Sequence, residues 1–140
     1  MNSEMWARMH GATVHFPIAL MLGSGALDAL GFFFPGLAIR RGLHVASYWM
    51  TILGALGTAP VVVSGLVMSK GVVLGHDALR YHHLFAWPAF ALIVGIAVWR
   101  AFAGDFSTKG APAAYVATVG FAAALIMGAG YWGGEMALGH

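Results

Sequence analysis

The stretch of sequence that decides the fold is Val14–Phe34, which reads VHFPIALMLGSGALDALGFFF and carries one acidic residue, Asp28, and no lysine or arginine. About 20 apolar residues in a helix cross a hydrocarbon core of about 30 Å, so this stretch predicts a transmembrane helix. The helix is expected to stop at Pro35–Gly36. Three similar stretches follow, and together the four predict transmembrane helices over about 14–34, 45–68, 84–102 and 112–132.

The composition of the whole chain supports a membrane protein. Of its 140 residues, 60% are hydrophobic and only 9% are charged, and the mean hydropathy is +0.80. A water-soluble protein of this size has too little interior to hide so much apolar surface, so the surrounding solvent must be lipid. The length allows one domain, which spans 1–140.

An even number of transmembrane helices places both termini on the same side of the membrane. We call that side A, and it also holds the connection between the second and third helices. Side B holds the two short connections Gly36–Leu43 and Ala103–Gly110. Because short connections join antiparallel neighbours, the predicted fold class is all-α, an integral membrane four-helix up-down bundle.

Charge and cysteine content exclude several functions. The net charge is only +2 and no basic cluster suggests a nucleic-acid partner. Cysteine is absent, which excludes disulfides, thiolate zinc sites, cysteine-bound iron–sulfur clusters and covalently attached haem. Any cofactor must therefore be held by histidine, methionine, carboxylates or packing.

Histidine is the residue type that points to a function. Six of the seven histidines are expected at side A, namely His10, His15, His76, His82, His83 and His140. Two histidines on different helices at one depth are typical ligands of haem b in membrane cytochromes. We predict His15 and His83 as the axial ligands, with His82 as the alternative to His83. Two other readings remain open: a different metal site, or hydrogen-bonded border histidines that hold no cofactor.

Other residues at side A would complete such a site. Arg8, Lys70 and Arg80 are placed to neutralise haem propionates, and small residues such as Gly128 would let a porphyrin edge lie against a helix. The same small residues are also typical of close helix packing in lipid. One haem is expected; His10, His76 and His140 leave open a second haem, another metal, or no ligand.

The polar residues nearer side B receive a structural interpretation. Asp28 lies too far along its helix from His15 to touch the same haem, and it is expected to be protonated or to pair with Arg40 or Arg41. The single side-B histidine, His44, is expected to have an interfacial role only.

Two motifs resemble a widespread bacterial family of small four-helix membrane proteins, long labelled a domain of unknown function. They are His15-Phe16-Pro17-Ile18-Ala19-Leu20, with Asp28 in the same helix, and Gly133-Gly134-Glu135 followed by His140. The resemblance spans essentially the whole chain. It implies b-type haem held by His15 and a histidine that opens the third helix, with His140 next. It also implies association with c-type cytochromes or periplasmic oxidoreductases.

These observations predict a membrane b-type cytochrome subunit that passes electrons between the quinone pool and a periplasmic redox partner, without catalysing a reaction itself. The expected partners are lipid, other subunits such as a c-type cytochrome or periplasmic dehydrogenase, and a quinone where a site for one exists. Arg40–Arg41 tips side B towards the cytoplasm of a bacterial inner membrane, so both termini are expected in the periplasm. The alternatives are a cofactor-free anchor subunit of a redox complex, or a small metal or solute transporter.

Overall fold

The computed structural model describes residues 3–106 and 108–138, and in these residues it contains four α-helices and no strand. They are α1 (Ser3–Phe33), α2 (Arg40–Met68), α3 (Asp77–Ala103) and α4 (Ala113–Leu138). Each is long and apolar enough to cross a membrane. The predicted all-α fold class is confirmed.

The helices extend past the apolar stretches that the sequence marks. The largest difference is at α1, which begins at Ser3 rather than near 14 and has 31 residues, a length of about 46 Å at 1.5 Å per residue. Arginine and methionine favour helices, and long basic side chains at a helix end can reach the interface. The helix can therefore continue beyond the hydrocarbon core. As a result, His10 lies within α1 rather than before it.

The bundle consists of two helix pairs. α1 packs mainly along α2, and α3 packs mainly along α4. Within the first pair, Gly54 of α2 lies against Met21 of α1. Within the second pair, Gly128 of α4 lies against the Phe85 ring of α3. Because glycine lets helix axes approach closely in lipid, each pair forms a tightly packed unit.

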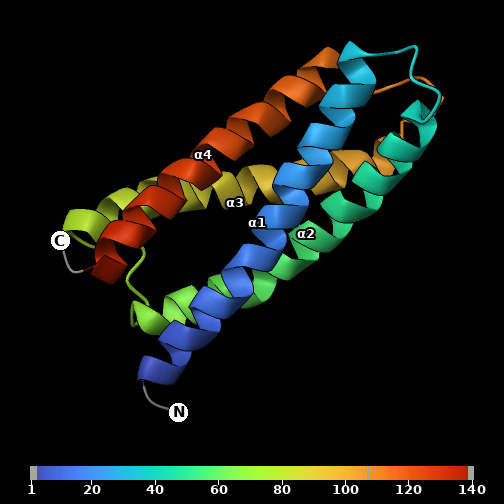
Figure 1. Cartoon of the computed structure of the whole chain (residues 1–140). Helices are drawn as coiled ribbons and strands as arrows, with labels where there is room; N and C mark the ends of the chain where they lie inside the picture. Colours follow the sequence, from blue (N-terminus) through green and yellow to red (C-terminus); the bar gives the residue numbers. More distant parts are fainter. Residues whose placement is uncertain (1–2, 107, 139–140) are drawn as a thin grey trace.

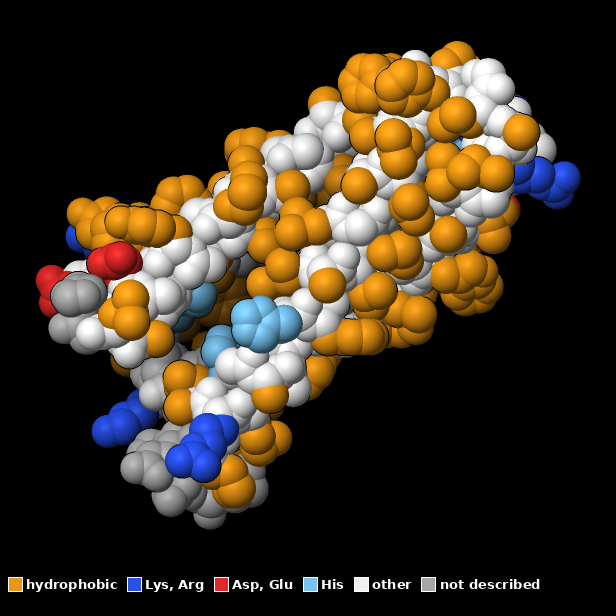
Figure 2. All heavy atoms as spheres, in the orientation of Figure 1, with side chains coloured by type: hydrophobic (Ala, Val, Ile, Leu, Met, Phe, Trp, Pro, Cys, Tyr) orange, Lys and Arg blue, Asp and Glu red, His pale blue; other side chains and the backbone are white. Residues whose placement is uncertain are grey.

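The two pairs lie close at side B and diverge at side A (Figure 1). Burial follows this arrangement, since no side chain in 5–16 of α1 or 127–138 of α4 is buried. The buried apolar cluster lies instead in the middle of the bundle and towards side B, and it comprises Met21, Ala89, Ile93, Ile96, Phe106, Ala111, Tyr115, Val119, Ala122 and Ile126. The divergence leaves a hollow between the pairs that opens at side A, with histidine side chains on its walls (Figure 2).

Candidate functional site

His82, near the start of α3, has a defined tautomer. Its Nδ1 lies 2.8 Å from the backbone carbonyl oxygen of Ala129 on α4. A carbonyl can only accept a hydrogen bond, so Nδ1 must carry the proton. In the neutral ring Nε2 then carries the free lone pair. A histidine whose Nδ1–H is held by a carbonyl is the usual form of a metal or haem ligand.

His10 of α1 has the same tautomer for a different reason. Its Nδ1 lies 2.9 Å from Ser64 Oγ on α2. The only hydroxyl hydrogen of Ser64 is donated to the Val61 carbonyl, so the serine oxygen must accept from His10 Nδ1–H. In the neutral ring the lone pair of His10 then lies on Nε2. The two histidines belong to different helix pairs, His10 to α1 and α2 and His82 to α3 and α4.

The two histidines predicted as axial ligands have different environments. His83 is buried, and its Nδ1 has no hydrogen-bond partner among the described residues. Its ring lies 6.0 Å from that of Trp87. His15 is exposed on α1, five residues and about 1.4 helical turns beyond His10. The alternate His140 lies outside the described residues.

Three other residues predicted for this site lie on α1, α3 and α4. Arg8 and Arg80 are exposed, and Gly128 is occupied on its open side by Phe85. Among the described residues no three histidine, aspartate or glutamate side chains come close enough to hold a metal ion together.

A second polar site, which the sequence did not predict, lies inside the bundle near side B. Asp28 of α1 is 1% exposed and His44 of α2 is 0% exposed. His44 Nδ1 lies 2.6 Å from Asp28 Oδ1, and the Ser47 hydroxyl donates to Oδ2. Both carboxyl oxygens of Asp28 therefore have a hydrogen-bond partner.

Arg100 of α3 supplies the compensating charge. Its Nη1 lies 3.4 Å from Asp28 Oδ2, and its Nη2 donates to the backbone carbonyl of His44 at 2.9 Å. The guanidinium also lies 4.2 Å from the centre of the Phe106 ring and 5.3 Å from that of Tyr115. All four helices or their connections thus contribute to one buried, charge-compensated cluster.

This cluster corrects two predictions. Asp28 pairs with Arg100 rather than with Arg40 or Arg41, because its side chain points into the bundle, whereas Arg40 Nε donates to the Gly31 carbonyl. His44 is fully buried and bonded to Asp28 rather than interfacial. A buried carboxylate in lipid requires such partners, since an unpaired charge there is costly.

The cluster leads to a prediction about Gly31. A Cβ at this position would lie 2.6 Å from His44 Nε2. We expect Gly31→Ala to lower the free energy of unfolding by about 1–3 kcal/mol, the usual cost of overpacking, measured by thermal unfolding in mild detergent. Gly42→Ala in α2 is the control, because nothing lies within 4 Å of its added Cβ. An unchanged stability in Gly31→Ala would contradict the packing described.

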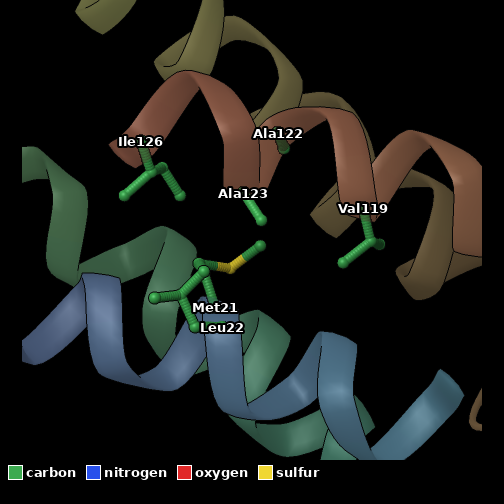
Figure 3. Close-up of a pocket in the computed structure, with 6 residues that line it drawn as sticks. All are labelled: Met21, Leu22, Val119, Ala122, Ala123 and Ile126. Atoms are coloured by element: carbon green, nitrogen blue, oxygen red, sulfur yellow. The ribbon is translucent and has the colours of Figure 1, made fainter. Parts of the chain in front are cut away.

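The surface between α1 and α4 carries a groove that faces lipid. It has a volume of about 270 Å³ and is lined by Met21, Leu22, Gly25, Ala26, Ala29, Val116, Val119, Gly120 and Ala123. A smaller depression continues it towards Ala122 and Ile126, where side chains of the two helices face one another (Figure 3). The lining is apolar and offers no polar side chain to a ligand.

The four long apolar helices define a small integral membrane protein. A family model described as "Predicted membrane protein (DUF2231)" matches residues 7–140, so the chain belongs to that family. No curated protein and no solved structure shows a match. The family description agrees with a membrane protein and names no activity.

Proposed function

We propose that this membrane protein binds haem b in the side-A hollow, through His10 and His82, and passes electrons between the quinone pool and a periplasmic redox partner. The observation that carries the proposal is the pair of fixed imidazoles on facing helix pairs, each with its lone pair on Nε2. This choice of ligands replaces the pair predicted from sequence, because the His15 ring has no described hydrogen bond to fix it and His83 lacks a bonded Nδ1.

The roles of the chain's own residues follow from their contacts. Ser64 and the Ala129 carbonyl hold the two rings by Nδ1 and raise the basicity of Nε2. Gly65 lies beside the His10 ring and Gly133 beside the His82 ring, which leaves room for both imidazoles against their helices. Bound haem would supply one-electron redox chemistry. The apolar groove between α1 and α4 is suited to a quinone tail.

The location and partners complete the proposal. Arg40 and Arg41 favour a cytoplasmic side B in a bacterial inner membrane by the positive-inside rule. The hollow and both termini then face the periplasm, where a c-type cytochrome or periplasmic dehydrogenase would exchange electrons. Exchange on that face requires no second haem at side B.

The test is a dithionite-reduced minus oxidised visible spectrum of the protein purified in mild detergent after expression with added haem. We expect a sharp b-type α-band that is lost in His82→Ala and in His10→Ala, because each variant removes one of the two ligands. The measurement is the band height per mole of protein.

His76→Ala is the matched control, since His76 is an exposed side-A histidine whose side chain makes no capping hydrogen bond. It should keep the full band. Loss of the band in His15→Ala and His83→Ala instead would return the assignment to the pair predicted from sequence. A flat spectrum of the wild-type protein would contradict haem binding and favour a cofactor-free anchor or a transporter.

A further inference from the structure

The cluster around Arg100 lies far along the helices from the histidine hollow, and the proposed electron transfer does not use it. The polar contacts that join the two helix pairs here include the Asp28–Arg100 ion pair and the hydrogen bond from Arg100 to the His44 carbonyl. Asp28 and His44 belong to the first pair and Arg100 belongs to the second. Arg100 therefore links the two helix pairs through an ion pair and a hydrogen bond.

These Arg100 contacts are buried and closely packed. Arg100 is 0% exposed, and aromatic rings from three parts of the chain surround its guanidinium: Tyr48, Phe106 and Tyr115. Gly25 of α1 nearby packs against Val119 of α4. Side B thus has both polar and steric contacts between the pairs.

The side-A half has the opposite character. The side-A hydrogen bonds of His10 and His82 stay within their own pairs, from α1 to α2 and from α3 to α4. No described side chain in the side-A ends of α1 and α4 is buried. Within each pair the helices are closely packed, at Gly54 in the first pair and at Gly128 in the second.

We propose that the Asp28–His44–Arg100 cluster is a hinge, about which the two helix pairs open and close the side-A hollow. Elements that pack together over one half of their length and diverge over the other can move by rotation about the packed half. A ligand that contacts both walls, His10 on one and His82 on the other, shifts this motion towards the closed form. The motion would regulate access to the proposed haem site, so the expected response to haem rests on the proposed function.

The test uses pairs of spin labels and pulsed electron paramagnetic resonance on the full chain in lipid nanodiscs. The sequence has no cysteine, so introduced cysteines are labelled selectively. Gly11→Cys with Gly130→Cys reports on side A, and nothing lies within 4 Å of an added Cβ at either position. Gly42→Cys with Ala101→Cys reports on side B, where both positions are exposed.

We expect a broad distance distribution at side A and a narrow one at side B. Added haemin should narrow the side-A distribution, shift it to shorter distances and leave side B unchanged. Equal widths at both sides would overturn the hinge. A broad side-A distance distribution that haemin does not change, together with a flat visible spectrum, would support the hinge and contradict the haem site.

The role of Arg100 is tested in the same side-B label pair. Arg100→Met should broaden the side-B distribution, whereas Arg41→Met, which changes an exposed arginine one residue from the start of α2, should not. If Arg100→Met does not fold, Asp28→Asn/Arg100→Met removes both charges and serves instead, with the same broadening expected. A narrow side B in the folded variant would overturn the assignment of the hinge to this cluster.

Discussion

Replacing Arg100 with methionine is expected to lower the free energy of unfolding by about 3–5 kcal/mol, the usual cost of removing one partner of a buried ion pair. Methionine retains a flexible apolar side chain, so the main loss is the positive charge beside Asp28 Oδ2. The Asp28 side chain would remain in an apolar bundle beside His44, Ser47 and Tyr115, none of which carries a fixed positive charge. The measurement is denaturant or thermal unfolding of the purified protein in mild detergent.

The double variant Asp28→Asn/Arg100→Met separates charge from packing. Asparagine keeps a carbonyl oxygen that can accept from His44 or Ser47 and carries no charge. We expect the double variant to be more stable than Arg100→Met alone, because no unpaired charge stays buried. Arg41→Met at an exposed position controls for loss of an arginine as such. Equal stabilities of the single and double variants would show that the charge pairing contributes nothing.

The sequence was sufficient to predict the fold because the relevant signal is local. Runs of apolar residues such as Val14–Phe34 mark a membrane helix wherever they occur, and short connections order such helices into antiparallel neighbours. The ends of the helices were less well predicted. Polar residues such as Arg8 and Arg80 continue a helix into the interface, where composition no longer distinguishes helix from connection.

The buried cluster could not be predicted because its partners are distant in sequence. His44 and Asp28 are 16 residues apart, and Arg100 bonds the His44 carbonyl across 56 residues. Arg40 and Arg41, which lie close to Asp28 in the chain, were the natural candidates for its partner. One signal was available: Arg100 comes at the end of an apolar run and Asp28 lies inside another, and opposite charges in lipid need one another.

The side-A histidines illustrate a limit of a different kind. Their positions along the chain correctly group the five described ones at one end of the bundle, but hydrogen bonding determines which ring nitrogen carries the proton. His82 and His83 are adjacent in sequence, and only His82 has its Nδ1 bonded to a carbonyl of α4. A choice between neighbours about 100° apart on a helix therefore depends on the helix that each one faces.

Replacing Tyr115 with alanine is expected to cost about 3–5 kcal/mol of unfolding free energy, as for other buried aromatic residues. Tyr115 is 0% exposed, and its ring contacts Trp99 and Phe106 edge-to-face at centroid distances of 5.5 and 5.0 Å. It also forms part of the aromatic surface around the Arg100 guanidinium. The alanine variant would leave a cavity in the core and remove one of the rings that stabilise the buried cation.

Tyr115→Phe is the control that isolates the ring from the hydroxyl. The buried hydroxyl lies beside Thr51 and Asp28 without a hydrogen bond of ordinary geometry to either, so its removal should change stability by about 1 kcal/mol or less. The two variants should therefore differ by most of the alanine effect in the same unfolding measurement. If phenylalanine were as damaging as alanine, the hydroxyl would have to hold a partner, such as an internal water molecule, and the cluster would be hydrated rather than dry.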